Sequence, residues 1–341
     1  MRIGIVGRPQ SGKTTLMQLL TQAKGVSPQK GAPSTVGVME VPDERVLWLS
    51  SLFRPRKTTF ARMDVQDIQP YKGQEFLNAV RNLDALIAVI PVFKDGGEEV
   101  SFLDDIETEF FVADLASVEG RLDRIRSNKA KPVSMAELPF LEKCREALDN
   151  GVPLSKVAFD PHEEDFVTNF AFYTRRPIVV AVNVSEASLL EKTYPGESAV
   201  EGKASLMGYP AVVFSGEVEP EIAALPEDDR QAFLQEYGLT EPGVTRIAKV
   251  CYEHLGLISF FTVGEDEVRA WTITRGTVAR EAAGKIHTDL KKGFIRAEVI
   301  PYECLREHGT VKACRDKGLV RLEGKDYVVQ DGDILTIRFN V

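Results

Sequence analysis

The chain has 341 residues, enough for two or three domains, and its 43% hydrophobic and 27% charged residues are close to soluble globular averages. A formal net charge of −9 argues against a protein that coats nucleic acid by bulk attraction, although a local basic patch remains compatible with it. No apolar run approaches the ~20 residues of a membrane span, and the first residues do not resemble a signal peptide. The four cysteines include no CxxC pair, so neither a zinc knuckle nor a disulfide framework is indicated. We therefore expect a cytoplasmic protein without a membrane partner.

Short apolar runs predict buried strands at residues 3–6, 86–90, 178–182 and 211–214. Helical patterns lie between these runs, and the first run leads through a glycine-containing turn into a helix with Leu16, Leu19 and Leu20 on one face. This alternation predicts an α/β fold whose mostly parallel sheet is covered on both faces.

The stretch between residues 90 and 178 is predicted to be helical. Apolar residues from Leu103 to Ile125 indicate one long helix, and Ser134 with Glu137 fits a capping box that opens a second helix. Pro139 lies inside the second helix, where proline can introduce a kink. We therefore expect a helical hairpin inserted at residues 98–165 of a nucleotide domain formed by residues 1–97 and 166–257.

Two further signals complete this division of the chain. Asp160-Pro161 with Glu163 in the first turn predicts a third helix start that leads back to the sheet. After residue 257, apolar runs at 268–273, 294–299 and 335–339 predict strands, and Asp331-Gly332 predicts a turn. Residues 258–341 should thus form a small separate α+β domain.

Residues 7–14 fit the P-loop pattern G-x-x-x-x-G-K-[ST]. Backbone N–H groups of such a loop point at phosphate oxygens, Lys13 should reach the β- and γ-phosphates, and the Thr14 hydroxyl should ligate Mg²⁺. A chance match in a glycine-containing turn is the alternative, but a strand precedes the motif and a helix follows it. The predicted phosphate-binding residues are Gly7, Gln10, Ser11, Gly12, Lys13, Thr14 and Thr15.

A second carboxylate on the Mg²⁺ side is needed at the end of another strand. Asp67 is the preferred candidate, Asp64 is its rival, and an ordinary solvated strand-end carboxylate is the alternative. A switch threonine that ligates Mg²⁺ is expected between the P-loop and this strand, and Thr35 is the best placed, although an ordinary loop threonine is equally compatible.

The run at 178–182 ends in Asn183-Val184-Ser185-Glu186, where GTPases place N-K-x-D. Guanine selection depends on a bidentate acceptor, so replacing its Asp by Glu186 should weaken the preference for guanine. A solvated polar turn is the alternative. We predict base contacts at Asn183, Val184 and Glu186, and a last base-side loop at Ser215, Gly216 and Glu217.

The order of a P-loop, an N-x-x-E motif, a helical insertion and a small C-terminal domain resembles the YchF or Obg-like ATPase family. Phe260-Phe261-Thr262, the segments 267–272, 282–289 and 292–297, and the ending Phe339-Asn340-Val341 resemble that family's TGS domain. The resemblance covers nearly the whole chain. It implies a G-domain-like P-loop NTPase with a ubiquitin-like β-grasp TGS domain, ATP binding in preference to GTP, weak hydrolysis, and association with ribosomes.

Three residues or segments depart from the family pattern. Gln10 stands where the family's P-loop usually has Asn, which is linked to potassium-stimulated hydrolysis. The Asp-x-x-Gly motif appears as Asp67-Ile68-Gln69-Pro70, and the segments after it and around Thr35 look short. Nucleotide binding is therefore better supported than catalysis.

Residues 269–296 hold seven basic and two acidic side chains, an excess of five positive charges in an acidic protein. This excess could steer the small domain to RNA phosphates, and a solvated surface with scattered charge is the alternative. Together with the family resemblance, it predicts ribosome or ribosomal RNA binding through the TGS domain and the helical insertion. Two functions remain: a slow ATPase that acts as a switch on translation, or a nucleotide-binding regulatory or scaffold protein that has lost hydrolysis. GTP binding is a further alternative.

Overall fold

The computed structural model describes residues 1–22, 34–93 and 100–340. By their contacts, these residues form two compact units. One unit contains Met1–Gly37 and Asp64–Val244, and the other contains Val38–Met63 and Thr245–Val341. Two boundaries fall inside strands and the third falls inside a helix, so the chain crosses between the units three times.

The first unit is built on a sheet in which β4, β1, β5, β6 and β7 are neighbours in that order, and each of these neighbouring pairs is parallel. In spatial order, the six strands seen in the described residues are β2 (Ser34–Val41), β4 (Ala61–Ile68), β1 (Arg2–Val6), β5 (Ala85–Pro91), β6 (Ile178–Asn183) and β7 (Ala211–Phe214). Almost every residue of β5 and β6 is buried, which requires cover on both faces of the sheet. The predicted parallel sheet and its four predicted strands are confirmed.

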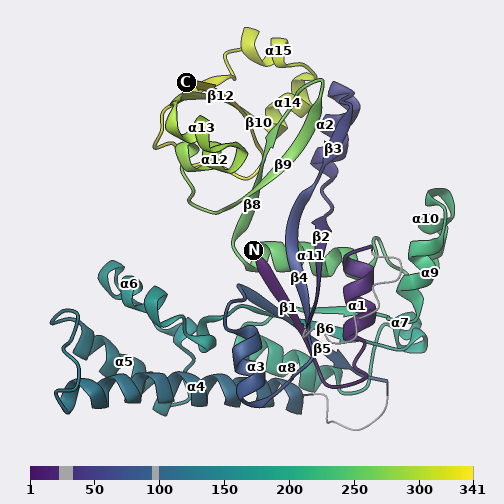
Figure 1. Ribbon diagram of the computed structural model, residues 1–341. Coiled ribbons are helices and arrows are strands. Elements are labelled where there is room, and N and C mark those ends of the chain that lie inside the picture. The colour runs from purple at the N-terminus through teal and green to yellow at the C-terminus, as the bar shows by residue number, and fades with distance from the viewer. Residues whose placement is uncertain (23–33, 94–99, 341) are drawn as a thin grey trace. The chain divides into compact units, whose positions relative to one another are not determined.

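Amphipathic helices provide this cover (Figure 1). They are α1 (Lys13–Leu20), α3 (Gly73–Val80), α7 (Glu186–Glu191), α8 (Glu197–Met207), α9 (Val218–Ala224) and α10 (Glu227–Glu236). Phe76 of α3, Val200 of α8 and Ile222 of α9 belong to one core cluster with alternate residues of β5 and β6. The apolar runs that predicted strands are thus also the centre of the core.

The insertion is helical, as predicted. It consists of α4 (Ser101–Arg126), α5 (Glu137–Asp149), the 3₁₀ turns η1 (Leu154–Lys156) and η2 (Tyr173–Arg175), and α6 (Pro161–Phe170). Figure 1 shows α5 lying beside α4, and the two helices share a core around Phe140. The predicted start at Asp160 is confirmed, because its side chain accepts from His162 N and Glu163 N in a capping box with Pro161 at the first helical position.

The start of α5 differs from the prediction. The Ser134–Glu137 capping box does not form, since the N-cap of α5 is Ala136 and Glu137 instead pairs with Arg121 of α4, with an Nε–Oε1 distance of 2.7 Å. Glu137 also accepts from Val133 N at 2.6 Å. A buried ion pair between the two helices therefore replaces a local cap. Pro139 lies in the first turn, where no intrahelical N–H bond is lost, so it does not need to kink the helix.

The second unit contains a sheet of six strands within the described chain. In spatial order these are β11 (Arg321–Glu323), β10 (Phe294–Pro301), β12 (Asp333–Phe339), β8 (Leu257–Thr262), β9 (Glu267–Thr274) and β3 (Lys57–Thr59). Its helices are α2 (Glu44–Phe53), most of α11 (Gly243–His254), α12 (Ala279–Ile286), α13 (Thr288–Lys292), α14 (Tyr302–His308) and α15 (Val311–Asp316). The three strands predicted in the C-terminal segment are confirmed as β9, β10 and β12, and the predicted turn has Gly332 at φ +90°.

Residues 38–63 group differently from the expected domain boundaries, which assigned them to the nucleotide domain. Strand β3 pairs in parallel with β9, and Thr59 Oγ1 donates to Glu267 Oε1 at 2.6 Å. These partners are about two hundred residues away in the sequence, so no local pattern indicates the pairing. Within the described ranges, no helix is long and apolar enough to cross a membrane.

Candidate nucleotide-binding site

Residues 7–12 form the turn between β1 and α1, and Lys13 and Thr14 are the first residues of that helix. The backbone turns sharply there, with φ of +62° at Gln10 and +96° at Gly12. A Cβ at Gly12 would lie 2.2 Å from Asn183 Nδ2, so only glycine allows the loop to approach the end of β6 this closely. The turn leads directly into the N-terminus of α1, the position at which helices bind phosphate.

Lys13 is buried beneath this loop. Lys13 is only 8% exposed, and its Nζ donates to Gly7 O at 2.8 Å and to Arg8 O at 3.2 Å. Burial lowers the pKa of Lys13, and the nearby Asp67 carboxylate opposes this effect. The ammonium is thus positioned by the loop carbonyls close to where a bound phosphate chain would lie.

Asp67 lies near the carboxyl end of β4 and is 3% exposed. Its Oδ2 accepts from Thr14 Oγ1 at 3.2 Å and from Gln69 Nε2 at 3.0 Å. Its Oδ1 is buried and has no hydrogen-bond partner within the described chain. Burial raises the pKa of Asp67, and Lys13, Thr14 and Gln69 oppose that shift. A carboxylate oxygen of this kind beside a threonine hydroxyl is a suitable donor set for Mg²⁺, which prefers oxygen ligands.

The other two candidates for the metal side are placed differently. Asp64 is on the same strand as Asp67 but three residues earlier, and it is exposed to solvent. Thr35 lies at the beginning of β2 and is half-buried, so it is in a strand and not in a loop. Among the residues that the structure describes, the Thr35 side chain makes no hydrogen bond to Thr14 or Asp67. The structure therefore joins Thr14 to Asp67 by a hydrogen bond, and Thr35 remains a predicted ligand.

Asn183 connects the P-loop to the loop after β7. Its Nδ2 donates to Ser11 O at 3.1 Å, and its Oδ1 accepts from Gly216 N at 2.8 Å. Asn183 and Ser215 are buried, whereas Glu217 is exposed at the start of α9. The Asn183 amide thus fixes the distance between two of the predicted nucleotide-binding loops.

Val184 and Glu186 have different environments. The Val184 side chain, which we predict to contact the base, is 1% exposed and belongs to the core cluster of the first unit. Glu186, at the start of α7, is exposed, and its Oε1 accepts from the Tyr237 hydroxyl at 2.6 Å. This hydrogen bond raises the pKa of Tyr237 to about 12. Tyr237 therefore orients the carboxylate that replaces the guanine-reading Asp.

Two contacts of this site have no signal in the sequence. Tyr237 is 51 residues from Glu186, and no motif marks it. Arg8 Nη2, in the P-loop, donates to Asp105 Oδ2 at 2.9 Å and to Ser101 Oγ at 2.8 Å in the first turn of α4. The second contact joins the phosphate loop directly to the helical insertion.

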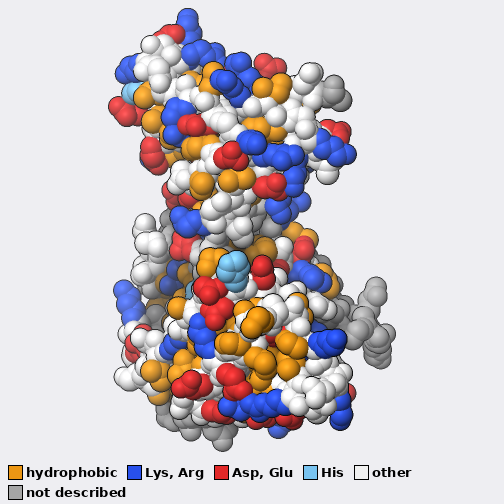
Figure 2. All heavy atoms as spheres, turned by 90° about the vertical axis from the view of Figure 1, so that its left-hand side faces the viewer, with side chains coloured by type: hydrophobic (Ala, Val, Ile, Leu, Met, Phe, Trp, Pro, Cys, Tyr) orange, Lys and Arg blue, Asp and Glu red, His pale blue; other side chains and the backbone are white. Residues whose placement is uncertain are grey.

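The basic segment 269–296 is partly neutralised by nearby acids. Lys291 pairs with Glu281, and Arg269 lies 3.9 Å from Glu267. Lys292 and Arg296 are exposed and form no ion pair within the described ranges. On the face of the C-terminal unit shown in Figure 2, Lys and Arg side chains are interspersed with Asp and Glu. The free positive charge is therefore smaller than the composition of the segment indicates.

Comparisons with known proteins show which sequences this chain resembles. The family model YchF-GTPase_C, described as "Protein of unknown function (DUF933)", matches residues 257–340. The chain is 38% identical to "Ribosome-binding ATPase YchF" of Bacillus subtilis, covering 99% of each chain, and 35% identical to the Escherichia coli O157:H7 protein of the same name, covering 100% of this chain and 99% of the other. It is 33% identical to "Obg-like ATPase 1" of Caenorhabditis elegans, covering 100% and 92%.

A solved structure gives the same result for the fold. The YchF GTPase of Schizosaccharomyces pombe superposes with a TM-score of 0.87 at 26% identity, covering 99% of this chain and 97% of the other. The alignment with the Bacillus protein spans 367 positions, more than the 341 residues of this chain. That relative therefore has residues that this chain lacks.

Proposed function

The chain belongs to the YchF family of Obg-like ATPases, and from this membership we propose that it is an ATP-binding P-loop switch protein that hydrolyses ATP slowly and associates with ribosomes. The observation that carries the proposal is the arrangement at the P-loop, where Lys13 and Asp67 are buried and the hydroxyl of the exposed Thr14 donates to Asp67. Burying a lysine and an aspartate is destabilising unless each charge has a partner. A triphosphate would pair with the lysine, and Mg²⁺ would pair with the aspartate.

The residues present fit a nucleotide with Mg²⁺. Thr14 and Asp67 would hold the ion, with Thr35 as the third proposed ligand, and the ion would neutralise charge on the phosphates. Lys13 would exchange its bonds to loop carbonyls for bonds to phosphate oxygens. The partnerless Asp67 Oδ1 supports a ligand at this position, because a buried carboxylate oxygen is otherwise left unsatisfied.

We propose that the base site prefers adenine. Glu186 is longer than the Asp that reads guanine, and Tyr237 holds its carboxylate at 2.6 Å, which occupies one of the acceptor positions that guanine needs. Adenine lacks the 2-amino group of guanine, which is the group that the Asp of GTPases binds. The names of the bacterial relatives, which are ATPases, agree with this preference, while the GTPase title of the fission-yeast structure keeps GTP as the alternative.

Ribosome association is proposed from the names of the bacterial relatives and from the exposed cations Lys292 and Arg296 of the TGS-like unit. Replacing both by Ala should weaken co-sedimentation with ribosomes most at low salt, because phosphate contacts lose strength as salt rises. The matched control replaces the exposed Lys312 and Lys317, which changes the net charge equally. Equal ribosome binding by the two double variants across the salt series would show that Lys292 and Arg296 do not contribute to it.

A protein that binds nucleotide without hydrolysing it is the second candidate. Pro70 favours it, since this position cannot donate an N–H to the γ-phosphate. Single-turnover measurements with ATP, with and without ribosomes, separate the two functions.

The binding step itself is tested with Lys13→Ala. Removing a charge-assisted contact should cost roughly 1.5–3 kcal/mol, which weakens MgATP binding about ten- to a hundred-fold in calorimetry. Lys72→Ala is the matched control, because Lys72 is exposed and carries the same charge. An affinity of the Lys13 variant equal to that of the control would contradict the proposed site.

A further inference from the structure

A cavity lies at the end of the first unit's sheet that is opposite to the P-loop. It has a volume of about 350 Å³ and is lined by residues 81–84, which precede β5, and by residues between the end of α6 and Pro177, which precede β6. Since β5 and β6 are parallel, the cavity lies at their amino ends. The P-loop follows the carboxyl end of β1, which is parallel to β5, so this cavity is separate from the nucleotide site.

Three arginines, Arg81, Arg175 and Arg176, line this cavity, and Asp84 is the one acidic residue in its lining. Such a local excess of positive charge contrasts with the net charge of −9 for the whole chain. The Arg176 side chain is held against the backbone at Arg81, because Arg176 Nη2 donates to the main-chain carbonyl of Arg81 at 3.0 Å. An anion in the cavity would reduce the repulsion between the arginines that line it.

Arg176 has a side-chain donor without a hydrogen-bond partner in the described part of the chain. Its guanidinium lies over the Tyr173 ring at 5.1 Å from the centroid, and the Tyr173 hydroxyl accepts from Arg81 Nε at 3.4 Å. The Nη1 group of Arg176 is buried and has no hydrogen-bond partner in the described part of the chain. A purely structural arginine would have its buried donors satisfied, because an unsatisfied charged donor is destabilising.

The carboxylates near Arg176 are engaged elsewhere. Asp84 Oδ2 accepts from Arg2 N at 2.7 Å. Both oxygens of the buried Asp114 accept backbone N–H groups, from Tyr173 at 2.9 Å and Thr174 at 2.8 Å. No carboxylate of the described residues therefore bonds to the buried Nη1.

We propose that this cavity binds a phosphate group, with Arg176 and Arg81 as its main ligands and Arg175 at its edge. Planar guanidinium groups match the oxygens of phosphate in two-point hydrogen bonds, so arginine side chains suit such a ligand. Arg175 already pairs with Glu164 at 3.3 Å, so its contribution is smaller. The phosphate could belong to the RNA backbone or to a small phosphorylated molecule.

The test uses Lys13→Ala as the background, so that the P-loop does not take up the probe. One arm titrates inorganic phosphate at constant ionic strength by calorimetry. The other arm titrates a short single-stranded RNA with unphosphorylated ends by fluorescence anisotropy. Arg81→Gln and Arg176→Gln are compared with Arg145→Gln, a partly exposed arginine of α5 whose replacement changes the charge equally.

We expect Arg81→Gln and Arg176→Gln each to weaken binding about ten-fold, as the loss of a charge-assisted hydrogen bond predicts, and Arg145→Gln to leave it unchanged. If these variants lose affinity only for RNA, the ligand is a phosphodiester. If they lose affinity for inorganic phosphate, the ligand is a free or terminal phosphate. If Arg176→Gln fails to fold by circular dichroism, the exposed Arg81 still provides the test. No binding of either probe, or equal affinity of Arg81→Gln and Arg145→Gln in both arms, overturns the proposal.

Discussion

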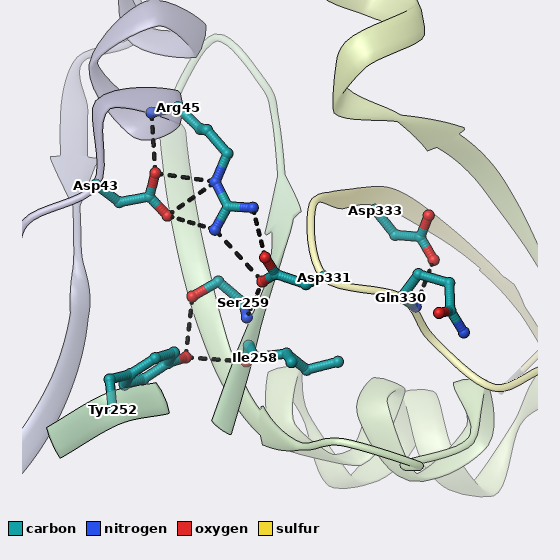
Figure 3. Close-up of polar contacts among 8 residues, drawn as sticks. All are labelled: Asp43, Arg45, Tyr252, Ile258, Ser259, Gln330, Asp331 and Asp333. Carbon is teal, nitrogen blue, oxygen red and sulfur yellow. Dashed lines mark hydrogen bonds and ion pairs between the residues drawn. The ribbon is translucent and has the colours of Figure 1, made fainter. Parts of the chain in front are cut away.

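Arg45 of α2 and Asp331, 286 residues later in the sequence, form a two-point ion pair with Nη1–Oδ2 and Nη2–Oδ1 distances of 2.8 and 3.3 Å (Figure 3). Asp43 accepts from the same guanidinium at 2.8 Å, and Asp331 also accepts from Ser259 N at 2.9 Å. Although partial burial opposes the charge, the two carboxylates raise the pKa of Arg45 above its ordinary value. The segment between the P-loop and Asp67 is in this way fixed to the C-terminal sheet within one unit.

Replacing Arg45 should destabilise that unit. Arg45→Met leaves Asp43 and Asp331 without their cation, and we expect a loss of about 1–3 kcal/mol of unfolding free energy. Denaturant unfolding followed by tryptophan fluorescence reports on this unit specifically, because both tryptophans, Trp48 and Trp271, lie in it.

The control for this prediction is Arg56→Met. The Arg56–Asp266 pair spans 3.3 Å in the same unit, but its side chains are 85% and 87% exposed, so the change in stability should be small. Equal unfolding midpoints for the Arg45 and Arg56 variants would show that the two-point pair does not stabilise the unit.

Nucleotide binding should depend on pH through Asp67. Burial raises its pKa above the ordinary aspartate value, so the folded protein without ligand is stabilised at low pH and loses that contribution as pH rises through the raised pKa. MgATP binding has the opposite sign, because the metal requires the ionised carboxylate. We therefore expect affinity for MgATP to fall as pH is lowered toward the raised pKa of Asp67, at a higher pH than for an ordinary aspartate.

Two variants isolate this effect in calorimetry. Asp67→Asn should bind MgATP more weakly and show a flatter pH profile, whereas the exposed Asp64→Asn should retain the profile of the unmodified protein. A profile that stays steep in Asp67→Asn would assign the pH dependence to another group.

The contact between Tyr237 and Glu186 predicts coupled effects on the choice of base. Tyr237→Phe removes the hydroxyl that orients the carboxylate at 2.6 Å, and the ratio of ATP to GTP affinity should fall several-fold. In a double-mutant cycle with Glu186→Gln, the second change should add little to the first, since both act through one carboxylate. Additive effects in competition binding would mean that the two residues act separately.

The sequence predicted local features well and long-range contacts poorly. The P-loop at residues 7–14 lies between a strand and a helix, because its function depends on consecutive residues. Asp160 also caps a helix as expected, since a cap involves residues only three positions apart. Glu137 does not cap, because the partner available to it, Arg121, comes from a different helix. The ion pair is decided by packing, which the pattern of residues around position 137 does not contain.

The site and the units show the same division. Alternation along β4 places Asp67 on the buried face with Met63 and Val65 and Asp64 on the opposite face, so a local pattern distinguishes these two carboxylates. Tyr237 reaches Glu186 only because α7 and α10 pack in the same unit. Strand β3 has three residues and no distinctive apolar pattern, so its pairing with β9 follows from the tertiary structure and not from β propensity.

Intrinsic hydrolysis should be slow, and Pro70 should be one reason. A P-loop protein needs an attacking water in line with the γ-phosphate and a switch backbone that holds that phosphate. The glycine of Asp-x-x-Gly normally donates its N–H there, and Pro70 has no N–H and a fixed φ. Gln69, which could orient water, instead donates to Asp67 at 3.0 Å, and Gln74 donates to Asn78 on α3.

Single-turnover rates with saturating ATP, in potassium and in sodium, test this explanation. We expect turnover below ~1 s⁻¹ without a partner, little stimulation by potassium because Gln10 replaces Asn, and a faster rate for Pro70→Gly. Gln69→Ala serves as the comparison, since it removes the hydrogen bond to Asp67 without restoring an N–H, and it should not accelerate the reaction. Turnover of the unmodified protein at or above ~1 s⁻¹ would show that the altered switch is catalytically competent. A Pro70→Gly rate equal to the unmodified rate would show that the missing N–H does not limit hydrolysis.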